Sequence, residues 1–349
     1  RSFTHWIGGM GVLVFILCLL PLTGGYHMNL MKAESPGPSV SKLVPKVQST
    51  AKILYTIYII LTIVEIIFLL IGKMPLFDTL CLSFGTAGTG GFGIKNDSIA
   101  SYSTYNQVVI TVFMILFGIN FNAYYLLLTK KVMQAAKNEE VRYYLGIIGL
   151  AIVAIAINTR EMFTSFGRAF QQAAFQVGSI ITTTGYATTD FNVWPVFSKT
   201  ILVILMFVGA CAGSTGGGIK VSRLLILCKS ARKELQLYLH PNAVKKIKMD
   251  DKAIPHEVVR ATNMFLFVYI MIFVTSLLII SLDNLDMVSN FTAIAATLNN
   301  IGPGLGAVGP TGNFDTYSYI SKAVMIFDML AGRLEVFPLL LLFKRDTWR

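Results

Sequence analysis

The chain has 349 residues, of which 54% are hydrophobic and only 13% are charged, and its formal net charge is +11 at pH 7. About a quarter of the residues of a soluble domain are charged, so this composition excludes an ordinary soluble protein and indicates a membrane protein. Most of the 29 Lys and Arg residues lie between hydrophobic segments, at residues 24–52, 129–142, 219–260 and 344–349, a pattern that favours the positive-inside signature over nucleic-acid binding.

The first stretch, residues 1–49, combines an apolar run at 12–20 with a polar, proline-containing linker. The run lacks a small-residue cleavage site, so a signal peptide is disfavoured. Trp6 to Gly11 contains three glycines and predicts the start of a helix that packs closely against a neighbour. We expect residues 1–49 to be the last span of a first pore unit plus a cytoplasmic linker, in a chain that begins partway through a larger protein.

Residues 50–138 are predicted to form a second pore unit. Residues 53–71 are apolar and long enough to cross a bilayer. Pro75 suits the first turn of a short helix over residues 76–84, which the glycine-bearing residues 85–93 cannot continue. Residues 108–128 are then expected to cross the membrane again as one unbroken helix.

Residues 139–257 repeat this order as a predicted third pore unit. An apolar helix over residues 143–157 is followed by a second short helix within residues 163–181 and by a Thr-rich stretch. The next crossing begins at residue 196, breaks at the glycine-rich residues 209–218 and resumes at 221–227. We expect this to be the only broken span among those that follow the short helices.

Residues 258–349 are the predicted fourth pore unit, with a span over 264–282, a short helix over 287–298 and a last span over 323–343. The central glycines of the three units, Gly91, Gly185 and Gly302, are 94 and 117 residues apart, and the difference matches the large basic loop. This spacing indicates internal repetition with one insertion. The predicted fold class is an all-α polytopic membrane protein with repeated span–pore helix–filter loop–span units around a pseudo-fourfold ion pore.

The glycine-bearing loops carry the chemistry. Irregular backbone at membrane depth survives only where it is buried in protein or lines a watery cavity. Glycine permits the dihedral angles that point successive carbonyls inward at a dehydrated cation, and Thr can add a hydroxyl ligand. Close helix packing could explain one such Gly/Thr loop. Three of them, each between a short helix and a span, favour a selectivity filter. The candidate K⁺-binding filter residues are Thr89, Gly90, Gly91, Phe92, Thr183, Thr184, Gly185, Tyr186, Asn300, Ile301, Gly302 and Pro303.

Each unit has two spans, so the chain returns after each unit to the side of the membrane that carries the Lys- and Arg-rich segments. The short helices and their loops therefore enter the membrane from the other side. That face is predicted to be outside, and its acidic residues outnumber its lysines, as a cation entry path requires. The acids are Asp97, Asp190, Asp283, Asp286 and Asp315.

The three loops resemble the Thr-Val-Gly-Tyr-Gly signature of potassium channels, most closely at Thr183-Thr184-Gly185-Tyr186-Ala187. Residues 182–190, 213–220, 299–304 and 332–335 are the motifs that carry a wider resemblance. Through them, the whole chain is similar to the Trk/Ktr/HKT superfamily of potassium transporters, and most to the bacterial Trk-type membrane subunit. The resemblance implies four filter segments around one pore and potassium uptake across the cytoplasmic membrane. Three of the four segments are recognisable in this sequence.

The resemblance also implies a gate below the filter, formed by an intramembrane loop and a pore-lining arginine. Alternatives are a plain kink and a buried ion pair that fixes helix packing. A phosphate-binding loop is excluded because Ile219 separates Gly218 from Lys220. The candidate gate residues are Gly213, Ser214, Thr215, Gly216, Gly217, Gly218, Lys220 and Arg333.

No enzymatic activity and no covalently bound cofactor are predicted, and K⁺ is the expected transported ion. One alternative is the potassium-binding subunit of an ATP-driven pump; another is an intramembrane enzyme, which the scattered histidines disfavour. The resemblance implies a homodimer in the inner membrane with a cytoplasmic nucleotide-binding regulatory subunit. The basic segments leave open the binding of membrane lipids or of an acidic partner.

Overall fold

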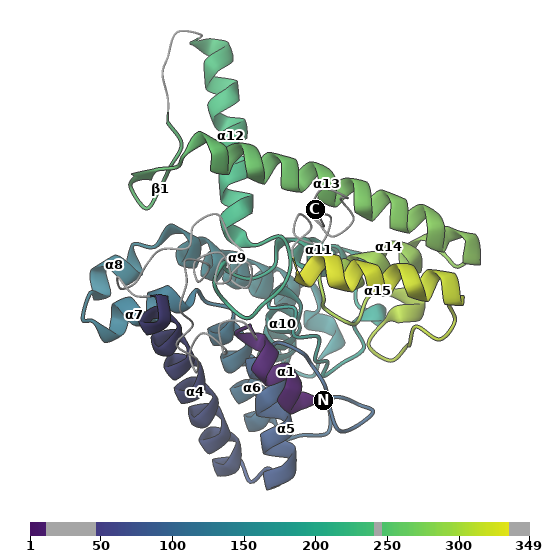
Figure 1. The fold of residues 1–349 in the computed structure, drawn as a ribbon. Coiled ribbons are helices and arrows are strands. Elements are labelled where there is room, and N and C mark those ends of the chain that lie inside the picture. The colour runs from purple at the N-terminus through teal and green to yellow at the C-terminus, as the bar shows by residue number, and fades with distance from the viewer. Residues whose placement is uncertain (12–46, 241–245, 335–349) are drawn as a thin grey trace, which may run out of the picture.

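The computed structural model describes residues 1–11, 47–240 and 246–334, and these residues are almost entirely helical (Figure 1). The first helix, α1 (Ser2–Gly9), lies against α5. A Cβ atom on Gly9 would lie 2.7 Å from both the Gly88 Cα and the Tyr58 hydroxyl, so α1 packs closely through its glycine, as predicted. The predicted helix start at Trp6 is wrong, because α1 begins at Ser2 and ends at Gly9. The apolar run at 12–20 lies outside the described residues.

The predicted second unit begins with the long apolar helix α4 (Val47–Ile71). Pro75 caps the short helix α5 (Leu76–Ala87), which continues through Gly85 and ends later than predicted. The segment predicted as one span over 108–128 is broken into α6 (Thr104–Phe117) and α7 (Phe121–Leu128), bent by 91°, and is followed by α8 (Val132–Ala136). The break follows from Asn120, whose side chain accepts the amide of Asn122 and so starts a new helix.

The predicted third unit contains α9 (Glu139–Asn158), the 3₁₀ turn η1 (Arg160–Met162) and the short helix α10 (Phe166–Ile181). The turn η2 (Phe191–Val193) leads into α11 (Val196–Val208). From Gly209 to Lys220 the chain is not helical, and we call residues 209–220 the glycine-rich loop. The break therefore lies where it was predicted, but it is not the only broken span. Helix α12 (Val221–Leu239) and a hairpin of β1 (Lys248–Met249) and β2 (Lys252–Ala253) follow.

The predicted fourth unit has α13 (His256–Ile280), the turn η3 (Ser281–Asp283), the short helix α14 (Met287–Leu298), the turn η4 (Gly306–Val308) and α15 (Tyr319–Arg333). Helix α13 begins earlier than predicted because its polar first turn, after Pro255, is also helical. The predicted bounds of α14 are confirmed. The predicted last span over 323–343 corresponds to α15 as far as Arg333, and its remainder lies outside the described residues.

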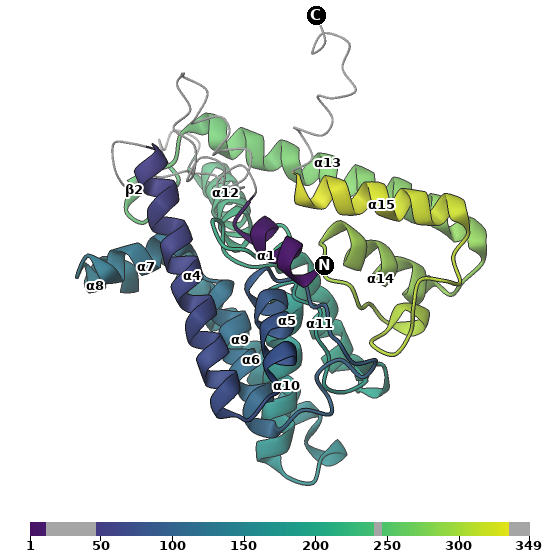
Figure 2. The ribbon, with the colours of Figure 1, turned by 60° about the horizontal axis from the view of Figure 1, so that its bottom comes forward.

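The short helices α5, α10 and α14 each pack against the long helix that precedes them, respectively α4, α9 and α13 (Figures 1 and 2). Their side chains form two buried apolar clusters, one around α4, α5 and α6 and the other around α9 to α15. Tyr186, which follows α10, belongs to the first cluster, so neighbouring units interlock.

Long apolar helices carry large exposed side chains on their outer faces, such as Leu150 on α9 and Leu278 on α13. In the described part of the chain, three helices are long and apolar enough to cross a membrane, or four if the bent pair α6–α7 counts as one span. An outward apolar surface of this extent has to face lipid or protein. The chain is thus a polytopic helical membrane protein.

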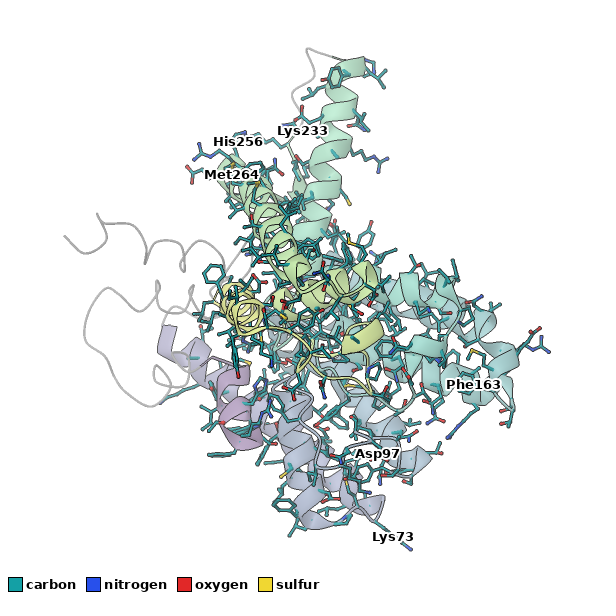
Figure 3. The ribbon with its side chains drawn as sticks, turned by 90° about the vertical axis from the view of Figure 1, so that its right-hand side faces the viewer. Lys73, Asp97, Phe163, Lys233, His256 and Met264 are labelled. Atoms are coloured by element: carbon teal, nitrogen blue, oxygen red, sulfur yellow. The ribbon has the colours of Figure 1, made fainter. Side chains whose placement is uncertain are left out.

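The two ends of the molecule differ in charge. Figure 3 shows Lys73 and Asp97 at the end where the loops before α6 lie, and Lys233 and His256 at the opposite end, on α12 and α13. The basic segment between α12 and α13 therefore lies away from Asp97, as the alternation of spans and short helices predicts.

Candidate functional site

The three short helices end in the same backbone conformation. Thr89, Thr183 and Asn300 follow the caps of α5, α10 and α14, and their φ angles of 53°, 57° and 58° are left-handed although none is glycine. Two residues later Gly91, Gly185 and Gly302 also have positive φ angles. Three non-glycine residues in this costly region, at equivalent places, indicate a geometry that the surrounding structure imposes.

One hydrogen-bond pattern closes all three helix ends. The amide two residues beyond each cap donates to a carbonyl in the last helical turn, with N–O distances of 2.8–2.9 Å, as in a Schellman motif. The pairs are Gly90 to Gly85, Thr184 to Ser179 and Ile301 to Ala296. The chain therefore leaves each helix in the same direction, and the internal repeat inferred from the sequence is repeated in the backbone. We call residues 89–92, 183–186 and 300–303 the three glycine segments.

The glycine segments lie side by side. A Cβ atom on Gly91 would lie 1.9 Å from the Thr184 carbonyl oxygen, and one on Gly185 would lie 2.0 Å from the Ile301 carbonyl oxygen. Each of these glycines thus faces the carbonyl that precedes the next glycine around an axis. At Gly302 a Cβ would meet nothing within 4 Å. Any side chain at Gly91 or Gly185 would displace a neighbouring backbone.

Two cavities border the glycine segments. One, of about 260 Å³, touches Gly91, Gly185, Gly302 and Pro303. The other, of about 970 Å³, runs along α15 from Lys322 to Arg333; the glycine-segment residues in its lining are Thr89, Gly90, Phe92, Thr183, Asn300, Ile301 and Gly302. The ends of α5, α10 and α14 point toward the segments, and their dipoles favour a cation there.

The aromatic residues of the segments are placed differently. Tyr186 is fully buried behind its segment, and its hydroxyl donates to the Leu82 carbonyl of α5 at 3.2 Å. Phe92 is half-buried and packs edge-on against His5 of α1, with the Arg1 guanidinium 3.8 Å from its ring centre. Tyr186 therefore packs the wall behind the backbone, whereas Phe92 faces the larger cavity.

The glycine-rich loop lies against the start of the glycine segments. Thr89 Oγ1 donates to the Thr215 carbonyl at 2.8 Å, and the Gly217 amide donates to Thr183 Oγ1 at 2.6 Å. A Cβ on Gly217 would lie 2.6 Å from the Asn299 carbonyl oxygen, next to the third segment. The structure thus brings the loop into contact with all three segments.

Within the loop, the remaining candidates make local contacts. Ser214 Oγ donates to the Cys211 carbonyl at 2.6 Å, and the Lys220 ammonium donates to the Gly216 carbonyl. Lys220 is buried and has a left-handed φ of 83°. Gly213 and Gly218 also have positive φ angles, of 68° and 79°. These positions let the chain reverse between α11 and α12 within the protein interior.

Arg333, at the end of α15, joins three parts of the molecule. Its Nη1 donates to the Thr215 carbonyl at 3.2 Å, and its Nη2 donates to the Gly8 and Gly9 carbonyls of α1 at 3.2 and 3.5 Å. The Thr215 carbonyl therefore accepts from both Arg333 and Thr89. The guanidinium is exposed to the larger cavity and places a positive charge beside the loop.

Glu140 was missed by the sequence reasoning. It lies in the first turn of α9, is 2% exposed, and accepts the amides of Ala212 and Ser222 on one oxygen at 2.6 and 3.2 Å. Its other oxygen accepts the Asn120 side-chain amide at 3.2 Å. One carboxylate thus connects both ends of the glycine-rich loop to the α6–α7 break. The sequence shows only two adjacent acids, Glu139 and Glu140, and no signal that the second is buried.

Glu65, the lone acid of α4, is fully buried beside Thr86 and Tyr186, behind the second glycine segment. The Thr86 hydroxyl and the Tyr186 hydroxyl both donate to the Leu82 carbonyl. Neither Glu65 oxygen has a hydrogen-bond partner of good geometry among the described residues. Glu65 lines neither of the two cavities that border the glycine segments.

Acidic side chains cap helices at the end of the molecule that carries Asp97. Asp286 caps α14, and hydrogen bonds from the hydroxyl and amide of Ser289 hold its pKa below the ordinary value. The amide of Ser318, at the start of α15, likewise lowers the pKa of Asp283. Both carboxylates therefore stay ionised at neutral pH.

In the ranges that the structure describes, no group of three His, Cys, Asp or Glu side chains could hold a metal ion. Cys81, Cys211 and Cys228 are free thiols, of which Cys211 is buried and Cys228 is exposed. The polar groups around the glycine segments are backbone carbonyls and hydroxyls, together with charged side chains of the larger cavity such as Arg1, Lys322 and Arg333.

Comparison with known proteins gives a consistent result. Residues 1–347 match the family model TrkH, described as a cation transport protein. The Trk system potassium uptake protein TrkH of Vibrio parahaemolyticus is 39% identical over 357 residues, and that of Salmonella typhimurium 37% over 354, covering 100% of this chain and 73% of each relative. The crystal structure of the potassium transporter TrkH from Vibrio parahaemolyticus superposes with a TM-score of 0.84 at 35% identity, covering 100% of this chain and 72% of that one.

Proposed function

Since this chain belongs to the TrkH family of cation transport proteins, we propose that it takes up K⁺ through backbone carbonyls of the three glycine segments. The family predicted from the motifs is thus confirmed, and the chain is a potassium uptake transporter rather than an enzyme. The filter assignment rests on one observation: three segments with the same backbone turn meet carbonyl to glycine around an axis.

The proposed mechanism is replacement of water by carbonyl oxygens. A K⁺ ion enters from the end that carries Asp97, Asp190 and Asp286, which we assign to the outside of the inner membrane. It loses its hydration shell between the segments, where carbonyls such as those of Thr184 and Ile301 act as ligands. The negative ends of α5, α10 and α14 then favour the cation in the larger cavity.

The proposed ring has four sides, of which this chain supplies three. Its relatives are longer, since the chain covers 73% of their length. The open space at Gly302 and the larger cavity beside α1 are where a fourth segment would lie. We propose that a fourth segment of the same repeat occupies this space.

The glycine-rich loop is the proposed gate. It lies against the start of each glycine segment and would obstruct an ion that leaves them. Arg333 adds a positive charge at the same place and is hydrogen-bonded to Thr215. Opening requires the loop to part from Thr89, Thr183 and Arg333, whose bonds to it are few and lie in one small region.

The names of the relatives describe parts of a Trk system. On that basis the protein is the membrane component, and a nucleotide-binding regulatory subunit at the basic end and a homodimer are the assembly we propose. Charge-based docking of the regulator predicts a complex that weakens as ionic strength rises. Binding that is unchanged between low and high salt would contradict docking through the basic segments.

The test of the filter is ⁸⁶Rb⁺ and Na⁺ flux into vesicles that contain the full-length protein. In Gly185→Ser the new side chain meets the Ile301 carbonyl, and φ is +84°, so K⁺ selectivity and rate should fall by at least about tenfold, equivalent to about 1.4 kcal/mol. Gly146→Ser is the matched control, because a Cβ there meets nothing within 4 Å. Wild-type selectivity and rate in Gly185→Ser would refute the assignment.

A further inference from the structure

A third cavity, of about 510 Å³, lies at the end of the molecule opposite Lys73, between α12, the β1–β2 hairpin and the start of α13. Three cations from three elements line it: Lys233 of α12, Lys246 before β1, and Arg260 of α13. The lining contains one carboxylate, Glu234. This cavity is separate from the glycine segments and takes no part in the proposed ion path.

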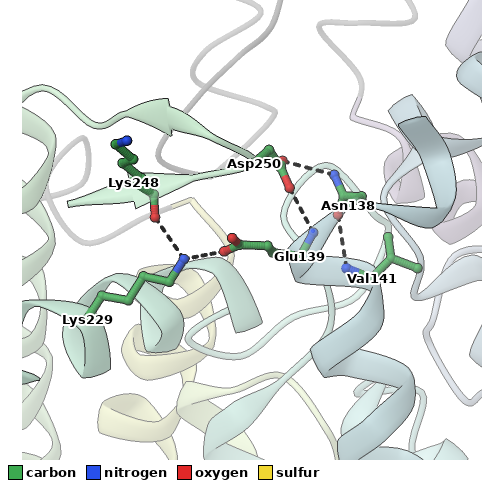
Figure 4. A network of polar contacts seen from close by, with 6 residues as sticks. All are labelled: Asn138, Glu139, Val141, Lys229, Lys248 and Asp250. Carbon is green, nitrogen blue, oxygen red and sulfur yellow. Dashed lines mark hydrogen bonds and ion pairs between the residues drawn. The ribbon is translucent and has the colours of Figure 1, made fainter. Parts of the chain in front are cut away.

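The walls of this cavity are fixed in place (Figure 4). Asp250, at the tip of the hairpin, accepts the Glu139 amide at 2.8 Å and the Asn138 side-chain amide at 3.3 Å. Lys229 of α12 donates to the Lys248 carbonyl at 2.8 Å and pairs with Glu139. These contacts hold the hairpin and α12 on the start of α9, so that the cationic side chains stay close together.

Among the described residues, the three cations are not paired with an acid. Within the ranges that the structure describes, none of Lys233, Lys246 and Arg260 forms an ion pair or a hydrogen bond with another described residue. Clustered like charges repel one another, and this raises the local affinity for an anion. Pro255 and His256, at the start of α13, also line this cavity, and no side chain caps this helix start.

An exposed apolar stripe continues from this cavity along α13. Met264, Phe267 and Met271 are 49%, 60% and 53% exposed, and they follow Arg260 at intervals of four, three and four residues, on one face of the helix. Figure 3 shows Met264, His256 and Lys233 at the same end of the molecule, and Met264 follows the polar start of α13. The cationic cavity and the apolar stripe thus adjoin one another, as the headgroup and the acyl chain of a phospholipid do.

We infer that this cavity binds the phosphate headgroup of an anionic phospholipid, with an acyl chain along Met264, Phe267 and Met271. Basic pockets that lie between helices at the cytoplasmic surface of the membrane bind anionic headgroups of this kind. A soluble phosphate compound would use the cations but not the stripe. A second copy of the chain or a protein partner would cover the stripe but would have to bring its own anion to the cavity.

The experiment places a fluorophore on the stripe of the full-length protein. Phe267→Trp is reconstituted with acyl-brominated phosphatidylglycerol or phosphatidylcholine, and the quenching of the parent protein, which has three Trp residues, is subtracted. We expect the anionic lipid to quench at several-fold lower mole fraction than the zwitterionic one. Each Lys or Arg near an anionic surface contributes about fivefold in affinity. Lys233→Gln with Arg260→Gln should therefore remove most of the preference.

The matched control is Lys130→Gln with Lys131→Gln, two exposed cations after α7 that do not line the cavity. This variant should keep the preference for phosphatidylglycerol. Equal quenching by both lipids, or a preference that survives Lys233→Gln with Arg260→Gln, would overturn the inference. Competition by water-soluble glycerol phosphate as strong as by the lipid would point to a soluble phosphate ligand instead. Weak quenching by every brominated lipid would indicate that protein covers the stripe.

Discussion

The break between α6 and α7 covers Gly118 to Asn120, whereas the break between α11 and α12 runs from Gly209 to Lys220. The short break is closed mainly by its own segment: the Gly118 amide donates to Met114, and the Ile119 amide to Leu116. Asn120 then starts α7 through its side chain. A bend held by neighbours in sequence keeps its shape wherever the rest of the protein moves.

The long break depends on other elements. Glu140, Thr89, Thr183 and Arg333 each bond to it from a different helix or segment. The two breaks also touch, since the Cys211 amide donates to the Gly118 carbonyl and the Phe121 amide to the Gly213 carbonyl. The short break is therefore a fixed support, and the long one is a loop whose position depends on contacts that can be lost. This difference is what suits the long break to gating.

The largest expected effect is that of Glu140→Leu. The substitution leaves the buried amides of Ala212 and Ser222 without an acceptor, at about 1–3 kcal/mol each, and should lower the free energy of unfolding by about 2–5 kcal/mol. Thermal unfolding in detergent measures the loss of stability. Basal ⁸⁶Rb⁺ flux measures the release of the glycine-rich loop, and this flux should rise.

The control for Glu140→Leu is Glu139→Leu at the neighbouring position. Glu139 is partly exposed, and its ion pair with Lys229 is worth at most about 1 kcal/mol. Glu140→Gln keeps one acceptor and should fall between the two. Equal effects at positions 139 and 140 would show that the buried carboxylate does not hold the loop.

A pair of glycine substitutions tests the two breaks directly. A Cβ in Gly217→Ala meets the Asn299 carbonyl at 2.6 Å, and in Gly118→Ala it meets the Tyr144 hydroxyl at 2.2 Å. Both should cost about 1–3 kcal/mol of stability, as overpacking does. Only Gly217→Ala should change ⁸⁶Rb⁺ flux more than twofold, because it pushes the loop off the third glycine segment. A similar change of flux in Gly118→Ala would contradict the assignment of the short break as a fixed support.

Arg333→Gln should have the smallest effect. It removes charge-assisted bonds to Thr215 and Gly8, and because the side chain is exposed to the cavity the loss is about 1 kcal/mol, or about fivefold in the open population. Initial rates of ⁸⁶Rb⁺ uptake should rise accordingly. Lys322→Gln, at the other end of the same cavity, removes an equal charge without touching the loop and should leave the rate unchanged. A matching increase in Lys322→Gln would assign the effect to charge alone.

Much of the fold follows from local signals. Pro75 marks the start of α5, and the predicted bounds of α14 agree with those observed. The break between α6 and α7 was not predicted, because one glycine and two asparagines in an apolar run are compatible with a continuous helix. The bend becomes evident only in the structure, where the Asn120 side chain accepts the Asn122 amide and so begins α7.

The sequence by itself determined the membrane class, the repeat and the family, because these depend on composition, spacing and motif. It also placed the residues of the glycine segments and of the glycine-rich loop. Only the tertiary structure decided that Glu140 rather than Glu139 is buried, that Arg333 joins α1 to Thr215, and that Gly91 and Gly185 face the carbonyls of the next segment. Those facts depend on which distant elements pack together, and burial and hydrogen bonding are set by that packing.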